Sequence, residues 1–289
     1  MISKNLKEKL IERIFLLCAI SSIGIIVLTV FVMVSNNFVL MDWFLNGFGF
    51  VFRSSETQFG IIPYIFTTLY VGVGATVVAS IIGIPCAIYL SEFANRKVRN
   101  IIKPSLELLT GLPSIVIGLI GFIVLLPVIS RVFNVTPGWG VFAAWILLGI
   151  MSLPHVASIS EDSMVAVPRE LREASLAMGA TEWQTTTRVV LPVAKSGVLT
   201  AVILGMGNAI GETMAVMMVI GSTPNPSIDP LALFSASNVI PSLIASYSRS
   251  DSATGNVITA LMAAAFILFV MTASMNAAIR ILTKQRAPK

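Results

Sequence analysis

Long runs of apolar residues alternate with polar segments along the whole chain of 289 residues. A bilayer core of about 30 Å takes roughly 20 residues of helix, and six of these runs are long enough to cross it. Strands of a membrane β-barrel would instead alternate over segments of about ten residues. The pattern therefore predicts an all-α membrane protein with six transmembrane helices, at about residues 13–36, 62–91, 104–131, 138–160, 194–222 and 255–283.

The positive charges lie in alternate polar segments. Of the 19 lysines and arginines, all but Arg53, Arg131 and Arg249 cluster at the N-terminus, between runs two and three, between runs four and five, or at the C-terminus, counting those at the adjoining ends of the runs. Segments rich in Lys and Arg stay in the cytoplasm, so both termini are predicted to be cytoplasmic. The net charge of +5 thus reflects orientation in the membrane, and a nucleic-acid partner is not expected.

The chain is predicted to form one membrane domain in two parts. Residues 1–61 hold the first transmembrane helix and an outer segment rich in Phe and Trp, which suits the membrane interface. Residues 62–289 hold the other five helices and a long polar loop, residues 161–192. Cys18 and Cys86 lie inside apolar runs, so neither a disulfide nor a metal site is expected.

The polar loop has the pattern of two short helices joined by a glycine turn. Pro168 is suited to the start of a helix. Gly179 follows a run of good helix formers and suits a left-handed C-terminal cap. Thr181 with Gln184 three residues later is the pattern of a capping box. The loop is therefore predicted to form a helix–turn–helix unit at the cytoplasmic membrane surface.

The spacing within this loop resembles the EAA motif of ABC importer permeases, which have the type I, MetI-like fold. Glu173-Ala-Ser is followed by three residues, Gly179, nine residues and Val189-x-Leu-Pro, where the family has Glu-Ala-Ala and Ile-x-Leu-Pro at the same spacing. The resemblance implies that the loop docks on a separate ATPase subunit. The residues expected to couple the two proteins are Glu170, Glu173, Ala174, Ser175, Gly179, Ala180 and Thr181.

No phosphate-binding G-x-x-x-x-G-K-[ST] motif occurs in the sequence. The chain itself is therefore predicted to be a permease subunit with no catalytic residues and no bound cofactor. By the resemblance, ATP and Mg belong to the partner ATPase.

An acidic residue lies deep in the fifth apolar run, in Gly205-Met-Gly-Asn-Ala-Ile-Gly-Glu-Thr-Met-Ala-Val. A charge at the bilayer centre costs about 3 kcal/mol or more, so Glu212 is expected to face the bundle interior or water. Helical spacing would put Asn208 and Glu212 on one face. Gly207 and Gly211 would allow close helix packing. We expect Asn208, Glu212 and Thr213 to line a translocation pathway.

The Gly211-Glu-Thr-Met string resembles PstC permeases of phosphate importers, as do Tyr89-Leu-Ser-Glu-Phe and Ser160-Glu-Asp-Ser-Met. The resemblance implies phosphate import across the cytoplasmic (inner) membrane with a PstA-like sister permease, a PstB-like ATPase dimer and a PstS-like binding protein. PstC-like chains usually have Arg at the position of Asn208. Without it, Glu212 is expected to be protonated or to pair with a basic residue of the sister subunit.

Besides an added regulatory role, in which a phosphate-sensing complex signals through its permease, two alternatives remain open on these residues. The first is a permease of the same architecture that carries another oxyanion or small solute. The second is a secondary carrier or channel that works without ATP, which the cytoplasmic coupling motif disfavours.

Overall fold

The computed structural model describes residues 4–35, 52–54, 57–59, 61–223, 229, 231–248 and 256–284. Six helical stretches in this part of the chain are long and apolar enough to cross a membrane, in agreement with the predicted all-α membrane fold. They are Ile11–Ser35, Ile61–Phe93, Ser114–Phe133, Val141–Val165, Glu182–Gly211 and Ala260–Ala277. Most of the predicted outer segment of residues 37–61 lies outside the described residues.

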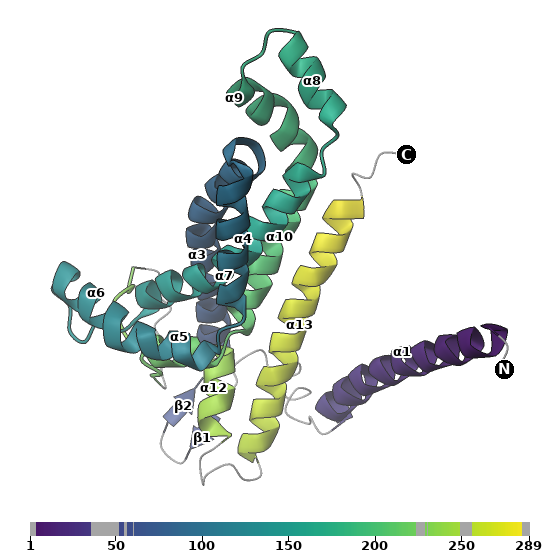
Figure 1. The fold of residues 1–289 in the computed structure, drawn as a ribbon. Coiled ribbons are helices and arrows are strands. Elements are labelled where there is room, and N and C mark those ends of the chain that lie inside the picture. Colours follow the sequence, from purple (N-terminus) through teal and green to yellow (C-terminus); the bar gives the residue numbers. More distant parts are fainter. Residues whose placement is uncertain are drawn as a thin grey trace.

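Figure 1 shows the order of the described elements along the chain. A small antiparallel pair of strands, β1 (Phe52–Ser54) and β2 (Thr57–Phe59), lies between the first two helices. The helices are α1 (Lys4–Ser35), α3 (Ile61–Ile88), α4 (Arg96–Thr110), α5 (Ser114–Ile120), α6 (Leu126–Phe133), α7 (Val141–Val165), α8 (Arg169–Ala177), α9 (Glu182–Thr185), α10 (Leu191–Gly211), α11 (Met214–Ile220), α12 (Ile240–Tyr247) and α13 (Asn256–Lys284). Three π-helical segments are η1 (Tyr89–Phe93), η2 (Gly121–Leu125) and η3 (Thr186–Val190).

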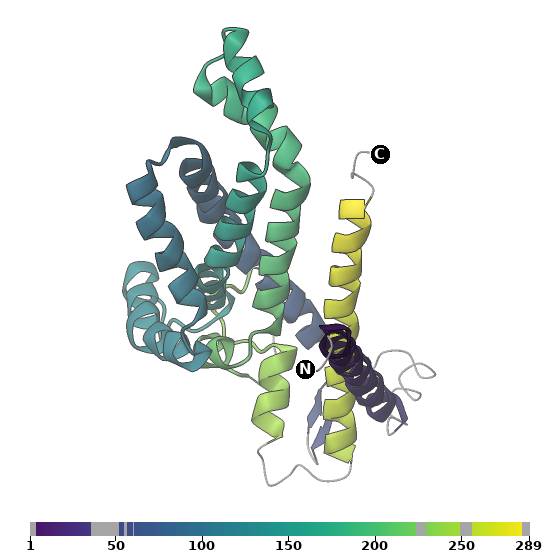
Figure 2. The ribbon, with the colours of Figure 1, turned by 45° about the vertical axis from the view of Figure 1, so that its right-hand side comes forward.

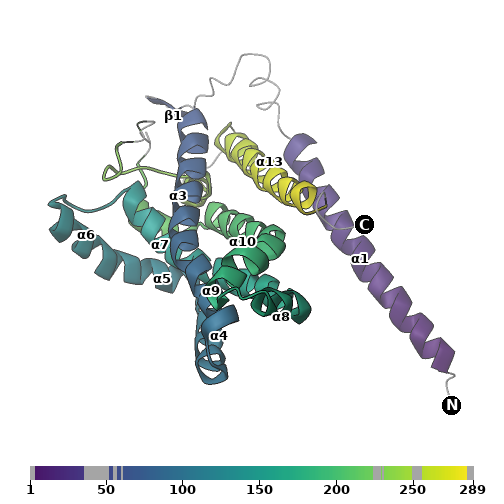
Figure 3. The ribbon, with the colours of Figure 1, turned by 90° about the horizontal axis from the view of Figure 1, so that it is seen from above.

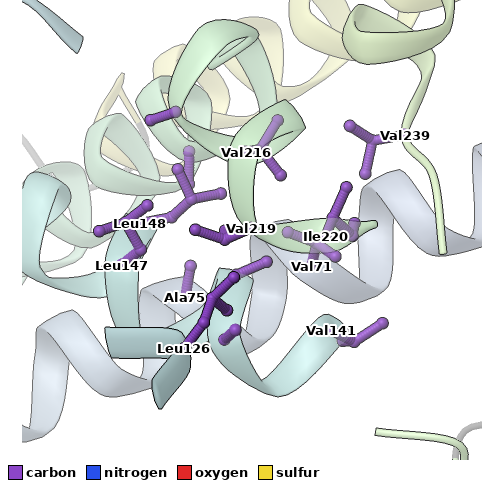
Figure 4. Close-up of a cluster of buried hydrophobic side chains, with 14 of the residues drawn as sticks. Val71, Ala75, Leu126, Val141, Leu147, Leu148, Val216, Val219, Ile220 and Val239 are labelled. Atoms are coloured by element: carbon purple, nitrogen blue, oxygen red, sulfur yellow. The ribbon is translucent and has the colours of Figure 1, made fainter. Parts of the chain in front are cut away.

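Helices α3, α7 and α10 pack against one another at the centre of the molecule. Small residues allow this, because a Cβ added at Gly149 would lie 2.6 Å from Val78 of α3 and one added at Gly205 would lie 2.8 Å from Val156 of α7. Close approach of backbones at small residues is typical of membrane helices. Aliphatic side chains of α3, α6, α7 and α11 fill the largest buried cluster, which Figure 4 shows.

Helix α1 stands apart from this bundle and contacts α13 (Figure 3). Its apolar side chains are exposed along nearly the whole helix. Apolar side chains on the outside are expected where lipid, and not water, is the solvent. The first predicted transmembrane helix is therefore an element with little packing against the rest of this chain.

Two of the predicted helices are broken in the structure. The run at 104–131 divides at Gly111–Pro113 into α4 and α5, because Pro113 lacks the N–H that would continue α4. The run at 194–222 divides after Gly211 into α10 and α11. The same run also begins earlier than predicted, because α9, η3 and α10 are continuous from Glu182 through Pro192.

Candidate functional site

The polar loop folds into two helices that project from one end of the molecule (Figures 1 and 2). We call residues 169–185 the projecting hairpin. Helix α8 begins after Pro168, and α9 leads through η3 into α10. Because α7 ends directly before the hairpin and α10 follows it, a force on the hairpin acts on two transmembrane helices through the backbone.

The predicted left-handed cap at Gly179 is confirmed. Gly179 has a φ of +84°, its N–H donates to Leu176 O at 2.9 Å, and the N–H of Ala180 donates to Ser175 O at 3.3 Å. This pair of hydrogen bonds is the Schellman motif, which satisfies the last carbonyls of α8. A Cβ at Gly179 would meet no atom within 4 Å, so only the backbone conformation requires glycine there.

The predicted capping box at the start of α9 is also confirmed. The N–H of Gln184 donates to Thr181 Oγ1 at 3.2 Å, and the N–H of Thr181 donates to Gln184 Oε1 at 2.9 Å. Both interactions satisfy N–H groups that would otherwise lack a partner at the helix end. The C-terminal cap of α8 and the N-terminal cap of α9 together fix the angle between these two helices.

The residues expected to couple to an ATPase lie on the two helices and the turn of this hairpin. Those exposed are Glu170, Glu173, Ala174, Gly179 and Thr181, and those half-buried are Ser175 and Ala180. Apolar side chains lie exposed beside them, and Met178 at the tip is 89% exposed. Exposed apolar groups on a polar projection are a feature of protein-binding surfaces.

Ser175, where the EAA motif has alanine, has a structural role. Its hydroxyl lies 2.9 Å from the hydroxyl of Thr185, which is buried. This hydrogen bond joins α8 to the end of α9. The sequence pattern did not indicate it, because the two residues are ten positions apart and meet only when the turn at Gly179 closes.

Arg172 makes contacts that the sequence did not indicate. It forms a bidentate ion pair with Glu92 of η1, with Nη2–Oε1 at 3.0 Å and Nε–Oε2 at 3.2 Å. The same guanidinium donates to Met164 O at 2.7 Å and Val167 O at 2.5 Å. Both side chains of the pair are largely buried, at 20% exposed for Arg172 and 10% for Glu92. Planar bidentate geometry is the strong form of an ion pair.

A second ion-pair cluster joins α4 to α7. Glu161 is fully buried and pairs with Arg99 and with Lys103, whose Nζ lies 2.6 Å from Glu161 Oε2. Lys103 also lies 2.5 Å from Asp162 Oδ1. Burial by itself would lower the pKa of Lys103, but its hydrogen bonds to Asp162 and Glu161 outweigh that effect and raise the pKa. Lys103 is therefore held as a cation.

Glu212 is not part of the helix face on which it was predicted to lie. Helix α10 ends at Gly211, and Glu212 has extended backbone angles. Its Oε1 accepts hydrogen bonds from the N–H groups of Thr213 at 3.1 Å and Ala215 at 3.2 Å. The side chain thus caps the first turn of α11, where N–H groups lack intrahelical partners and a negative charge is favoured.

The predicted close packing of Gly207 and Gly211 does not occur within the described part of the chain. A Cβ at either glycine would meet no atom within 4 Å. Asn208, Glu212 and Thr213 are half-buried beside this open face. The three residues of the predicted pathway therefore lie near one another in the chain, at the break between α10 and α11, with the Thr213 hydroxyl 3.4 Å from Gly211 O.

Comparison with known proteins assigns the architecture. Residues 80–287 match the family model of the binding-protein-dependent transport system inner membrane component. The chain belongs to this family. The match covers α7, the projecting hairpin and the break at Glu212, so the features described above lie within the family's domain.

Several relatives share a large part of the sequence. The phosphate transport system permease protein PstC of Mesorhizobium japonicum is 35% identical over 79% of this chain and 76% of its own length. PstC of Pasteurella multocida is 34% identical over 78% of this chain and 76% of its own length. The probable ABC transporter permease protein YqgH of Bacillus subtilis is 42% identical, over 58% of this chain and 55% of its own length.

Solved structures share the fold at low sequence identity. The inward-facing MetNI methionine ABC transporter matches with a TM-score of 0.62 and 18% identity, over 79% of this chain and 96% of the matched chain. An amino acid ABC transporter matches with a TM-score of 0.55 and 18% identity, over 78% of this chain and 93% of the matched chain. The predicted MetI-like permease fold is thereby confirmed.

Proposed function

We propose that this chain is the membrane-spanning permease subunit of an ABC importer that moves inorganic phosphate across the cytoplasmic membrane. The projecting hairpin carries this proposal. It presents the EAA spacing on two capped helices, with Glu173 and Ala174 exposed where another protein can reach them. Phosphate as the solute is supported by relatives named phosphate permeases at 34–35% identity over more than three quarters of this chain.

The chain performs no covalent chemistry in this proposal. A PstB-like ATPase dimer binds ATP and Mg, and its closure moves the projecting hairpin. A PstA-like sister permease lies against the open face of α10 at Gly207 and Gly211, where no atom of the described chain lies within contact distance. A PstS-like protein delivers phosphate to the outer side, and the pathway runs between the two permeases beside Asn208, Glu212 and Thr213.

Among the described residues, the three side chains predicted to line the pathway supply no cation. Asn208 has no charge, and the Glu212 carboxylate is engaged with two backbone N–H groups of α11. Any cation that meets phosphate in the pathway therefore comes from the sister subunit in this proposal. A permease of the same fold for another oxyanion is the second candidate, because Asn208 departs from the PstC pattern at this point.

Reconstitution of the complete complex tests the function. The chain is purified with its sister permease, ATPase subunits and binding protein, and placed in proteoliposomes. We expect phosphate to stimulate ATP hydrolysis and to accumulate inside, while sulfate and molybdate do neither. Stimulation by another oxyanion without an effect of phosphate would support the second candidate. Solute movement by the purified chain alone, without the ATPase, would support a carrier or channel.

A further inference from the structure

We propose that the ion pair between Arg172 and Glu92 is the link through which the projecting hairpin moves the second transmembrane helix. This inference rests on the proposed function, because it concerns how movement of the hairpin reaches the pathway. Arg172 would be a positioning residue that acts through Glu92 and touches no solute.

The link is needed because the backbone does not connect these elements directly. The projecting hairpin is continuous with α7 before it and with η3 and α10 after it. The second transmembrane stretch, Ile61–Phe93, ends at η1. Glu92 of η1 lies 80 positions before Arg172 of the hairpin in the sequence. A force on the hairpin can reach η1 only through side chains or packing between helices.

Two consecutive residues of η1 contact the two helices of the hairpin. Glu92 pairs with Arg172 of α8, with both guanidinium contacts between 3.0 and 3.2 Å. Phe93 packs against Trp183 of α9, with ring centroids 6.4 Å apart. One short segment thus holds both sides of the turn at Gly179, and the hairpin and η1 are expected to move as one body.

The segment η1, which makes both contacts with the hairpin, has π-helical geometry. The N–H of Ala94 donates to Tyr89 O at 2.8 Å, a hydrogen bond that spans one residue more than in an α-helix. One additional residue turns those after it by about 100° relative to a regular helix. Glu92 and Phe93, which contact the hairpin, are the last two residues of this π-helical segment.

Arg172 also ties the hairpin to the end of the preceding transmembrane helix. Its Nη1 and Nη2 donate to the carbonyls of Val167 and Met164, which lie at the end of α7 and just beyond it. Met164 lies in the last turn of α7, where a cation is favoured, and its carbonyl also accepts from the N–H of Val167 at 3.1 Å. The guanidinium of Arg172 in α8 therefore joins this helix to η1 and to the end of α7. A lysine ammonium lacks the planar fork of donors and cannot make all four of these hydrogen bonds.

Charge exchange in the reconstituted complex tests the link. Arg172→Glu and Glu92→Arg alone are expected to lower the phosphate imported per ATP hydrolysed by about tenfold, since loss of a largely buried pair leaves like charges facing each other. The double variant restores the ion pair but not the hydrogen bonds to Met164 and Val167, so it is expected to recover part of the wild-type ratio. Arg172→Lys is expected to give a ratio of phosphate imported to ATP hydrolysed between those of the wild type and Arg172→Glu. Arg96→Glu, an exposed arginine at the start of α4, is the control for charge reversal and keeps the wild-type ratio.

The ratio separates a link from a residue that only supports the fold. A merely structural role would lower assembly, ATP hydrolysis and import together and leave their ratio unchanged, and that result would overturn the proposal. Single variants with a wild-type ratio would overturn it as well, as would an assembled double variant that recovers nothing.

A second measurement does not depend on the solute. Spin labels at Lys97→Cys and Glu182→Cys report the separation of the α4 start and α9, with Cys18 and Cys86 replaced by alanine. The distance is expected to stay the same between the ATP-free and vanadate-trapped complexes, and to change on trapping in Arg172→Glu. If the wild-type complex imports no phosphate, the proposed function fails and this distance alone tests the link. A distance that changes in the wild type would overturn it.

Discussion

Gly179 sets the shape of the projecting hairpin through its backbone alone. Its φ of +84° lies in the left-handed region, where an ordinary L-residue costs about 1–2 kcal/mol. The space around it is open, so a side chain there meets no steric obstacle from the described chain. The cost of a substitution is therefore conformational, and it falls on the angle between α8 and α9.

We expect Gly179→Val to uncouple ATP hydrolysis from solute import in the reconstituted complex, because a β-branched residue is strained at positive φ. Gly179→Asn is the matched control, since Asn tolerates this conformation and should keep most of the coupling. The measurement is the ratio of phosphate imported to ATP hydrolysed. Wild-type phosphate-stimulated ATPase activity and import in the valine variant would contradict the role assigned to the turn.

Asn208→Arg is expected to retain or raise phosphate uptake, because it introduces the cation that PstC-like chains usually carry four residues before the acid. Asn208 is half-buried and lies next to the face at Gly207, on the side where the proposed pathway between the two permeases runs. Initial rates of phosphate uptake in proteoliposomes measure the effect. Loss of uptake in a fully assembled complex would mean that Asn208 is an adaptation to a different pathway.

At the scale of elements, short helices are held in place by charged side chains at their ends. Helix α11 has only seven residues and begins at a break in the membrane segment, where Glu212 caps it. Helix α4 buries none of its own residues, and ion pairs from Arg99 and Lys103 to Glu161 hold it against α7. Packing alone would leave α4 weakly attached, whereas α11 also buries Ala215, Val216, Val219 and Ile220 in the core.

Glu212→Ala should destabilise the purified complex by about 1–2 kcal/mol, because the first N–H groups of α11 lose their acceptor. Glu212→Gln keeps an acceptor oxygen and loses only the favourable charge at the helix end, a difference of about 0.5 kcal/mol. Thermal unfolding in detergent compares the two variants. Equal losses of stability in Glu212→Gln and Glu212→Ala would show that the negative charge matters at this position and that the capping hydrogen bonds do not.

Two neighbouring acids test the attachment of α4. Glu161→Ala leaves Arg99 and Lys103 facing a buried void and should cost about 2 kcal/mol, less than a fully buried pair because both cations are partly exposed. Asp162→Asn removes an acid that is 63% exposed and contacts the same lysine, so its cost should be below about 1 kcal/mol. Thermal unfolding of the two variants measures this difference in stability. Similar shifts of the unfolding temperature would contradict a larger contribution from the buried Glu161 ion pairs.

At the scale of the whole molecule, the projecting hairpin and the end of α13 lie toward the same end (Figures 1 and 2). Helix α12 lies at the opposite end (Figure 1). This arrangement agrees with the charge distribution, in which the C-terminal segment and the hairpin loop both carry the excess of Lys and Arg. The cytoplasmic location of the hairpin and of both termini remains a prediction from those charges.

Thiol labelling tests this orientation in a variant with Cys18→Ala and Cys86→Ala. A cysteine at Met178, at the tip of the hairpin, should react with an impermeant maleimide in inverted membrane vesicles and not in intact cells. A cysteine at Ser248, exposed at the end of α12, should show the opposite pattern. Labelling of both from one side would contradict the six-span topology.

The six apolar helices and the local shape of the hairpin could be predicted from the amino-acid sequence. Apolar runs and charge asymmetry are properties of composition, and they need no knowledge of which helices touch. The Gly179 turn and the Thr181 capping box depend on residues three to five positions apart, so a local pattern carries them in full.

Ion pairs between residues distant in sequence, and helix breaks inside apolar runs, depend on the tertiary structure. Arg172 and Glu92 are 80 positions apart, and Lys103 and Glu161 are 58 apart, so nothing local marks either pair. The break at Glu212 is also not evident from the sequence, because it lies inside a long, largely apolar run. There the carboxylate bonds to the backbone of α11, and this choice between helix and cap depends on how α10 and α11 pack against α7.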